Sequence, residues 1–296
     1  MKLLSAARHL VRRVGLDVAP WPHRPEAGVI DWALAEILRS RDINCAIDVG
    51  GNRGHFARRL RSLGYAGRIV SFEPSPSVLP DISAAAARDP DWIVRPLALS
   101  SQPGRASLRL HKGPELDSLH DALPGVTEQI PIMEETGTAT ITLSTLAAEF
   151  PAAIAGIGEP RVLLKSDTQG HEAEVLRGAG DGGLGPEVVA VLVELAAQPI
   201  YAGQPAMTTV MDLVMDDGFT AVAFEPLFQS SDGLRIVELD ALFLRPPDSE
   251  PDWGRHSDPV RQARRREGRG RHAGRDGAPA DAPRTASSGA GQVSAG

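Results

Sequence analysis

Two carboxylates flank a glycine-rich loop in the first third of the chain. The segment 48–54 reads DVGGNRG, and it overlaps the end of the apolar run 45–49, which predicts a strand. Glycines in such a loop let the backbone turn tightly and approach a ligand closely. Glu73 ends the next apolar run, 68–72, about 20 residues further on, where a carboxylate can accept hydrogen bonds from both ribose hydroxyls. The pairing predicts a site for a nucleoside-type cofactor.

The spacing of the glycines separates one cofactor class from another. They fall at 50, 51 and 54, so the G-x-G-x-x-G fingerprint of dinucleotide-binding proteins is absent. The loop begins with Asp48, an acid that would repel a pyrophosphate but suits the cationic methionyl amine of S-adenosylmethionine. No G-K-S/T sequence follows, which excludes a phosphate-binding P-loop. A tight loop that binds nothing is the alternative, and the acids at both strand ends argue against it.

A second group of chemical side chains follows the predicted strand 162–164. Lys165 and Asp167 are two residues apart, so we expect them to point to the same side of the strand. A lysine at the end of a buried strand needs a partner, which Asp167 or Glu194 could supply. Glu194 itself ends the aliphatic run 188–193, where burial without a partner would be expensive. Lys165, Asp167 and Glu194 are therefore candidates for catalysis.

Each of these residues also has a structural explanation. Lys165 and Asp167 could form a structural ion pair, and Glu194 could cap a following helix. A divalent cation shared by Asp167 and Glu194 is conceivable, but no third ligand stands out, so we expect no metal. His171 is the histidine candidate for a general base, with a simple surface residue as the alternative.

The elements that must position these residues alternate between strands and helices. Such alternation predicts an α/β fold with a doubly wound parallel sheet, whose ligands sit beyond the carboxyl ends of the strands. The stretch 104–137 has the least regular pattern and could be a substrate lid. Strands are expected at 45–49, 68–72, 92–97, 162–164, 188–193, 221–224 and 241–244, and helices at 30–38, through Phe56 and Leu60, at 76–87, after Gly170 and at 207–215.

Composition limits the partners. The 296 residues are 42% hydrophobic, enough for a buried core, and carry a net charge of −7. The negative charge and the 4% aromatic content argue against nucleic acid, which favours basic and base-stacking surfaces. No apolar run approaches the roughly 20 residues that span a bilayer. Cys45 is the only cysteine, so no internal disulfide is expected, and a cytoplasmic location fits best.

Several ordered motifs resemble the FkbM-type methyltransferase family. The resemblance spans roughly residues 40–245 and is more specific than one glycine loop. It rests on DVGGNRGHF at 48–56, LGYAGRIVSFEP at 63–74, LKSDTQGHE at 164–172 with VLRGA at 175–179, and Glu194 followed by YAGQP at 201–205.

This resemblance implies a Rossmann-like class I fold, with a seven-stranded, mostly parallel sheet, helices on both faces and an antiparallel last strand. It implies S-adenosyl-L-methionine as cofactor and O-methylation of a hydroxyl on a sugar, glycan or secondary metabolite. The matched motifs would place Leu99, within 97–100, near the adenine and Glu73 at the ribose. The methionine end would be lined by Asp48, Gly50, Asn52 and Gly54.

The matched motif after the fourth strand contains Lys165, Asp167 and Glu172, without settling their chemical roles. Our hypothesis is that Asp167 or His171 takes the hydroxyl proton and that Lys165 stabilises the developing alkoxide. Two positions depart from the family: Gly51 stands where alanine is usual, and Ser166 stands where an aliphatic residue is usual. We expect both to be chemically harmless, although Ser166 could weaken packing.

The chain divides into three zones that differ in residue composition. We interpret residues 1–40 as an N-terminal helical extension, 41–247 as the methyltransferase domain and 248–296 as a disordered tail. The tail has few bulky apolar residues, so burial cannot offset its ordering entropy. A small-molecule or glycan acceptor is the expected partner, and a homo-oligomer stays open. The competing classes are an NAD-type oxidoreductase and a non-catalytic cofactor-binding scaffold protein.

Overall fold

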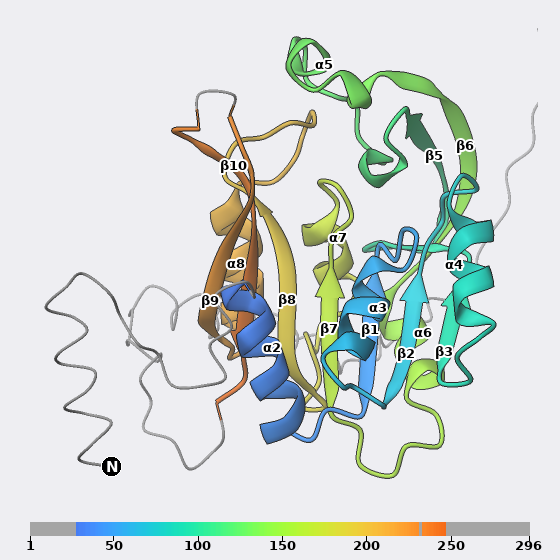
Figure 1. Cartoon of the computed structure of the whole chain (residues 1–296), viewed down its shortest axis with the longest axis vertical. Coiled ribbons are helices and arrows are strands. Elements are labelled where there is room, and N and C mark those ends of the chain that lie inside the picture. Colours follow the sequence, from blue (N-terminus) through green and yellow to red (C-terminus); the bar gives the residue numbers. More distant parts are fainter. Residues whose placement is uncertain (1–27, 231–232, 247–296) are drawn as a thin grey trace, which may run out of the picture. The chain divides into compact units, whose positions relative to one another are not determined.

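A seven-stranded sheet with the strand order β3-β2-β1-β7-β8-β10-β9 forms the centre of the protein (Figure 1). The structure is a computed structural model that describes residues 28–230 and 233–246. The expected helical segment before residue 28 and the expected tail 248–296 lie outside the described residues. Among the described residues, no helix is both long enough and apolar enough to cross a membrane.

The expected sheet architecture is confirmed. Neighbours among β3, β2, β1, β7 and β8 run parallel, and β10 runs antiparallel to both β8 and β9. Strand order reverses at β1, between β2 and β7, which is the topological switch point where ligands bind in open α/β sheets. The strands are β1 Cys45–Val49, β2 Arg68–Phe72, β3 Trp92–Arg95, β7 Val162–Ser166, β8 Val188–Ala196, β9 Thr220–Gln229 and β10 Ile236–Leu244.

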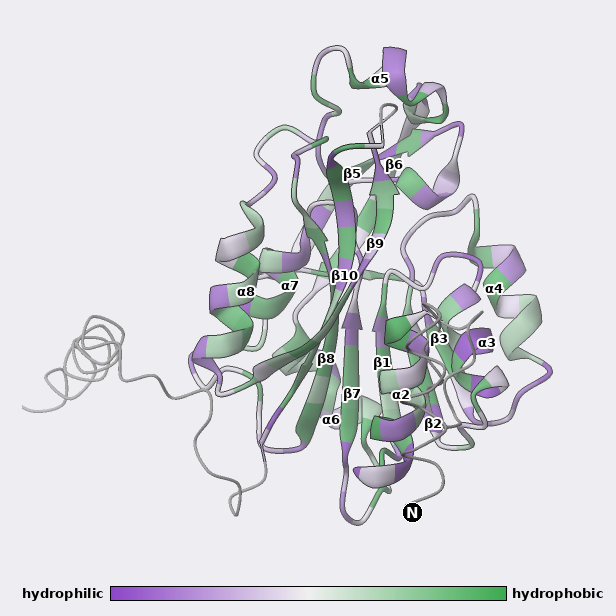
Figure 2. Cartoon of the chain, turned by 60° about the vertical axis from the view of Figure 1, so that its left-hand side comes forward, coloured by the Kyte–Doolittle hydropathy of each residue, from purple (hydrophilic) through white to green (hydrophobic). Residues whose placement is uncertain are grey.

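Helices cover both faces of this sheet, because each central strand sends apolar side chains to both sides. Every residue of β7 and all but the last of β8 are buried, and Figure 2 shows apolar colour along both strands. One face packs against α2 Val29–Ser40, α3 His55–Ser62 and α4 Leu79–Ala86, and the other against α6 Leu146–Ala153, α7 Glu172–Arg177 and α8 Met207–Asp216.

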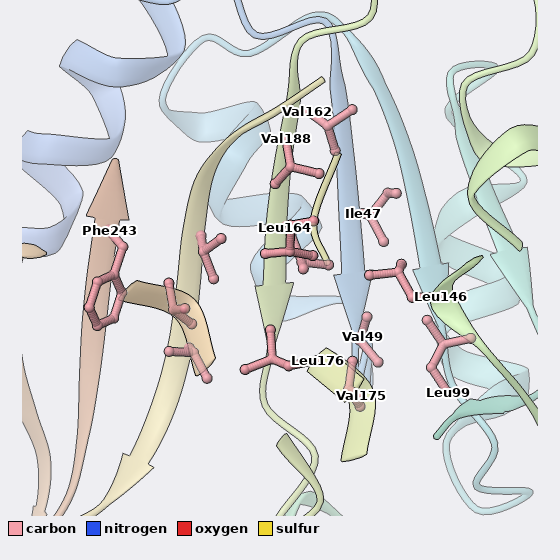
Figure 3. Close-up of a cluster of buried hydrophobic side chains, with 14 of the residues drawn as sticks. Ile47, Val49, Leu99, Leu146, Val162, Leu164, Val175, Leu176, Val188 and Phe243 are labelled. Atoms are coloured by element: carbon pink, nitrogen blue, oxygen red, sulfur yellow. The ribbon is translucent and has the colours of Figure 1, made fainter. Parts of the chain in front are cut away.

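Strand alternation decides which side chains face which layer. Ile47 and Leu164 belong to the core on the α6–α8 side, where Figure 3 shows them close together. Ala46 and Leu163 belong to the opposite core. Asp48 and Lys165 follow those two residues at a spacing of two, so both charged side chains lie on the α2–α4 side.

A second, three-stranded sheet corrects our reading of 104–137 as the least regular stretch. It has the order β4-β6-β5, with β4 at Ala98–Leu99, β5 at Gly104–His111 and β6 at Glu135–Ser144. Between β5 and β6 lie the short helix α5 Val126–Gln129 and two 3₁₀ turns, and Figure 1 shows this segment beyond the carboxyl ends of the main strands. Few residues of β5 and β6 are buried, so the sequence carried no clear strand alternation.

The described part of the N-terminal segment is helix α2, and it packs onto the far edge of the sheet. Its buried residues Ile30, Leu34 and Ile37 lie in the core of the α2–α4 side. The backbone N–H of Ile30 donates to Oε2 of Glu225 in β9, at 3.0 Å. The helix therefore supports β9 and β10.

Candidate active site

A cavity of about 430 Å³ opens where the carboxyl ends of β1, β2, β7 and β8 lie beside the amino-terminal half of β10. The loop after β1 forms one wall, and the segment between β5 and α5 covers it. Gly50, Glu73, Asp167 and Glu194 all contribute to its lining. The strand-end motifs that the sequence singled out therefore meet in one cavity at the topological switch point.

Glycine is required where the loop after β1 turns. Gly50 has φ +81°, and a Cβ there would lie 1.8 Å from the carbonyl oxygen of Asp167. Gly54 has φ +79°, and a Cβ there would lie 2.4 Å from the Trp92 ring. The N–H groups of Gly50 and Gly51 both donate to the carbonyl oxygen of Phe72, at 3.0 Å. The loop is thus tied to the end of β2 and keeps bare backbone toward the cavity.

Glu73 projects from the end of β2 and accepts two backbone hydrogen bonds. Its Oε2 accepts from the N–H of Asn52 at 2.6 Å and its Oε1 from the N–H of Ser75 at 2.7 Å. Burial raises the pKa of Glu73 to about 7, against the lowering effect of these bonds. Leu99, the predicted adenine neighbour, lines the same cavity. Glu73 is therefore positioned to accept hydrogen bonds from hydroxyl groups of a ligand.

Asp48 lies beneath the loop, away from the cavity lining. It is fully buried, and its Oδ2 accepts from the hydroxyl of Ser71 at 2.8 Å. Its Oδ1 lies 3.3 Å from Nζ of Lys165, and burial raises the pKa of the carboxyl. Of the four residues expected at the methionine end, Gly50 and Asn52 line the cavity, whereas Asp48 and Gly54 support the loop from behind.

Lys165 joins the two sides of the site. Its Nζ donates to the carbonyl oxygen of Gly50 at 2.8 Å and lies 3.4 Å from Oδ2 of Asp167 and 5.7 Å from the centre of the Phe56 ring. Burial alone would lower the pKa of the ammonium, but the carboxylates of Asp167 and Asp48 outweigh it and raise the pKa. Lys165 therefore stays charged and holds the loop and Asp167 together.

Gln169 is a site residue that the sequence analysis missed. Its Nε2 donates to Glu194 at 2.9 Å and to Asp167 at 3.2 Å, while its Oε1 accepts from the hydroxyl of Tyr201 at 3.0 Å. Gln169 has φ +54°, which turns the chain after β7 so that the amide reaches both acids. Its place between Asp167 and Gly170 in a matched motif was the available signal.

Glu194 sits among other acids at the ends of β8 and β10. Its residue partner across the antiparallel pair is Asp240, and Glu238 lies two residues before Asp240. All three line the cavity. Burial and the neighbouring carboxylates, Asp167 first, raise the pKa of Glu194 well above its ordinary value. Glu238 and Asp240 were missed; their alternation in β10 was a signal, but only the sheet register shows what they face.

His171 precedes α7 and is held by two side chains. Its Nδ1 lies 3.1 Å from Nε2 of His120, and its Nε2 lies 3.0 Å from the hydroxyl of Ser100. Burial, and then the neighbouring His120, lower the pKa of His171 to about 4. The ring is therefore neutral at pH 7 and lines the cavity as a weak base. His120 comes from the segment between β5 and α5, so that segment contributes to the site.

The remaining motif positions have structural roles. Oε1 of Glu172 accepts from the N–H groups of Thr168 at 2.7 Å and Gly170 at 3.2 Å, which fixes the turn after β7. A Cβ at Gly51 would meet Cδ1 of Ile82 at 2.8 Å, so this chain has little room for the family's usual alanine. The hydroxyl of Ser166 is buried without a hydrogen-bond partner among the described residues, an unfavourable arrangement.

Metal binding has no geometric support in the described ranges. No group of three or more His, Cys, Asp or Glu residues within 28–230 and 233–246 could hold a metal ion. Asp167 and Glu194, the pair that could share one, are instead bridged by the Gln169 amide.

Comparison with known proteins identifies a family and a set of distant structures. The family described as "Methyltransferase FkbM domain" matches residues 48–229, more than half of the chain. No curated protein sequence matches significantly. Fibrillarin from Aeropyrum pernix, solved with S-adenosyl-L-methionine, is 14% identical, with a TM-score of 0.38 over 73% of this chain and 74% of that one.

Two further solved structures show the same level of similarity. A precorrin-6y C5,15-methyltransferase from Geobacter metallireducens is 12% identical, with a TM-score of 0.37 over 76% of this chain and 92% of that one. A putative O-methyltransferase from Klebsiella pneumoniae is 12% identical, with a TM-score of 0.38 over 82% of this chain and 90% of that one. The sheet topology and the family match carry the assignment here.

Proposed function

We propose that this chain, which belongs to the methyltransferase FkbM family, transfers the methyl group of S-adenosylmethionine to a hydroxyl of a sugar, glycan or secondary metabolite. The observation that carries the proposal is the single cavity that joins Gly50 and Glu73 on one side to Asp167 on the other. A cofactor on the first side would thus face a proton acceptor on the second.

The residues present fit the cofactor. Gly50, which has no side chain, and Asn52 line the cavity where the methionine end can lie. Glu73 can accept hydrogen bonds from the ribose hydroxyls while it keeps its own backbone bonds. Leu99 lines the cavity as an apolar neighbour for the adenine. When bound, S-adenosylmethionine supplies a methyl group on a positively charged sulfur, which an oxygen nucleophile can take directly.

The protein's own work is then alignment and proton transfer. Alignment of an acceptor oxygen with the methyl group is worth about 7–11 kcal/mol in favourable cases. A general base adds about 10²–10⁴-fold. Asp167 is our first candidate, because its side chain is partly exposed and Lys165 and Gln169 hold it in place. His171 is the second, because Ser100 and His120 already occupy both of its ring nitrogens.

Lys165 acts in this scheme as a positioning residue. Its ammonium already contacts the carbonyl oxygen of Gly50 and the carboxylates of Asp48 and Asp167. An ammonium has three N–H donors, so none is left over for a developing alkoxide. This favours a role in fixing the loop and Asp167, in place of the alkoxide stabilisation expected from the sequence.

The deciding experiment is calorimetric binding of S-adenosylmethionine, S-adenosylhomocysteine and NAD to the full-length protein. We expect the first two compounds to bind the wild-type protein. Glu73→Ala should bind them at least about tenfold more weakly, whereas Glu128→Ala, at an exposed glutamate of α5, should bind them as the wild type does. Binding of NAD alone would return the protein to the oxidoreductases. Binding of none would favour a scaffold. A screen for transfer of labelled methyl to hydroxyl-bearing acceptors then tests O-methylation.

A further inference from the structure

The cavity is more acidic than binding of a methyl donor requires. Seven carboxyl groups line it, against one lysine and one arginine. The lysine, Lys165, is already engaged by Asp48 and Asp167. S-adenosylmethionine carries a sulfonium, an ammonium and a carboxylate, so its net charge is +1. The site therefore has more carboxyl groups than the cations of the protein and of the cofactor can pair with.

The excess carboxyl groups gather on one face of the sheet, at the ends of β7, β8 and β10. Asp240 lies directly across from Glu194 in the antiparallel pair, a spacing at which side chains touch. Glu238 and Asp240 alternate along β10, so they share that face. Ser166 pairs with Val193, so Asp167 follows in the same row as Glu194. We call Glu194, Glu238 and Asp240 the acidic end of the cavity.

Glu238 shows that this acidic end is incomplete in the described protein. The residue is 7% exposed and lines the cavity, yet its Oε1 has no hydrogen-bond partner among the described residues. A buried carboxylate oxygen without a donor is costly, so it points to a ligand that donates there. The nearest arginine gives Asp240 little compensation, since Nη1 of Arg59 lies 3.8 Å from Asp240 while Nε of the same guanidinium pairs with Asp31.

We propose that the acidic end binds a protonated amine of the acceptor, so that the acceptor is a hydroxyl compound that carries an amine, such as an amino sugar. This inference rests on the proposed methyltransferase function for the word acceptor, but the amine subsite itself rests on Glu194, Glu238 and Asp240. Carboxylates keep the amine protonated and without a free electron pair. It therefore serves as an anchor, and the methyl group goes to a hydroxyl near Asp167.

An ammonium fits the acidic end better than a metal ion does. It needs only several acceptor oxygens around three N–H donors. A divalent cation demands a defined ligand set, and no such set occurs within the described ranges. The three acids come from two adjacent strands, which surround a cationic group from one side and leave the Asp167 side open to the rest of the acceptor.

The titration behaviour of the acidic end supports cation binding. Burial raises the pKa of Glu238 to about 7 and that of Asp240 to about 6. A bound cation favours the ionised forms, so binding releases protons and tightens as the pH rises through this range. The charged groups that face the acidic end are Asp167 and Lys165 of the β7 end, Glu172 of α7, Glu225 of β9 and Arg59 of α3.

The test uses full-length protein saturated with S-adenosylhomocysteine and two matched probe pairs. Each pair compares an amine with its N-acetyl counterpart: glucosamine with N-acetylglucosamine, and ethanolamine with N-acetylethanolamine. Ligand-observed NMR and calorimetry report binding. We expect each amine to bind at least about tenfold more tightly than its N-acetyl counterpart, glucosamine at pH 7 and ethanolamine at pH 8. Ethanolamine, whose amine stays protonated throughout, should bind at least about fivefold more weakly at pH 6 than at pH 8.

The preference should vanish in Glu238→Gln and weaken in Asp240→Asn, while Glu128→Gln keeps it. Retained binding of S-adenosylhomocysteine in these variants shows that they are folded. Equal binding of amine and N-acetyl probes, or a preference that survives in Glu238→Gln, would overturn the proposal. So would displacement of the amine by Mg²⁺ or Mn²⁺, which indicates a metal site. An amine preference that is present without S-adenosylhomocysteine and disappears when it is added would assign the acids to the cofactor, and would overturn the proposal too.

Failure of the proposed function has a different signature. If S-adenosylhomocysteine does not bind the wild-type protein, the methyltransferase proposal fails, and the amine pairs are measured without it. An amine preference that depends on Glu238 then still establishes the cationic subsite. Its absence in that measurement removes the subsite as well.

Discussion

Nζ of Lys165 donates a 2.8 Å hydrogen bond to the carbonyl oxygen of Gly50, so the end of β7 holds the turn that follows β1. These two strands pair directly at the topological switch point. The same ammonium lies within ion-pair distance of Asp48 and Asp167. The ammonium of Lys165 therefore holds the glycine loop after β1 and the candidate base Asp167 together.

Replacement of this cation should damage both stability and cofactor binding. Lys165→Met leaves Asp48 fully buried without its partner, and removal of one member of a buried pair costs about 3–5 kcal/mol. We expect that decrease in the free energy of unfolding, measured with urea, together with weaker binding of S-adenosylhomocysteine. Lys112→Met is the control, because Lys112 pairs with Glu134 in an exposed position. Equal stability of the two variants would show that the buried pair is unimportant.

Alanine substitutions at Gly50 and Gly64 distinguish the effect of a steric collision from that of backbone strain. Both have positive φ, +81° and +87°, so alanine at either position costs about 1–2 kcal/mol. Only at Gly50 would the new Cβ collide, 1.8 Å from the carbonyl oxygen of Asp167, whereas Gly64 has open space. We expect Gly50→Ala to weaken S-adenosylhomocysteine binding at least tenfold in calorimetry and Gly64→Ala to leave it unchanged. Similar affinities in both variants would contradict the close approach at Gly50.

Cofactor affinity should depend on the ionisation of Glu73. Burial raises the pKa of this carboxyl to about 7, and ribose hydroxyls donate best to the ionised form. At pH 6 about a tenth of the protein has Glu73 ionised, so binding of S-adenosylhomocysteine should be about tenfold weaker than at pH 8. Calorimetry at pH 6, 7 and 8 measures this. Glu73→Gln should bind weakly with a flatter pH profile, and an unchanged profile would assign the titration elsewhere.

Asp167 and His171 can be distinguished by their effects on turnover. Asp167→Asn keeps an acceptor oxygen for Gln169 but cannot take a proton, so turnover should fall by about 10²–10⁴-fold. S-adenosylhomocysteine affinity should stay within about threefold. His171→Gln should retain turnover within about tenfold. The measurement is transfer of labelled methyl to an acceptor from the amine-bearing screen, and full activity in Asp167→Asn with loss in His171→Gln would reverse the assignment.

The main sheet could be predicted from the sequence because its central strands are buried on both faces. The aliphatic run in β8 has no other good explanation than a buried strand. Sequence reasoning failed for β5 and β6, where few residues are buried and the two strands pair across the stretch that holds α5. Their pairing depends on contacts far apart in sequence, which local patterns do not encode.

The site residues likewise divide into those that lie in local sequence motifs and those that only strand pairing brings to the cavity. Gly50, Glu73 and Asp167 stand at strand ends inside recognisable motifs, so the sequence singled them out. Glu238 and Asp240 stand in a strand that runs the opposite way, and only the antiparallel register with β8 brings them to the cavity. The alternation of Glu238 and Asp240 was visible in the sequence, but Glu238 could be assigned to the site only from the register of the assembled sheet.

Glu238 should also make stability depend on pH in a definite direction. Burial raises its pKa from 4.5 to about 7, so between these values the folded state binds more protons than the unfolded state. Protonation of Glu238 therefore contributes to the free energy of unfolding. This contribution is complete below pH 4.5 and is lost as the pH rises through 7. Glu238→Gln removes this dependence. Its free energy of unfolding relative to wild type should therefore rise between pH 5 and pH 8 by on the order of 2 kcal/mol.

Urea unfolding of both proteins at pH 5 and pH 8 measures this difference. Glu73 titrates in the same direction, and His171, with its lowered pKa, in the opposite one. Both effects occur in wild type and variant alike, so they cancel in the comparison. A difference between the two proteins that stays constant with pH would mean that Glu238 is ionised at its ordinary pKa. The carboxylate would then have a partner in solution, and no ligand would be needed to supply one.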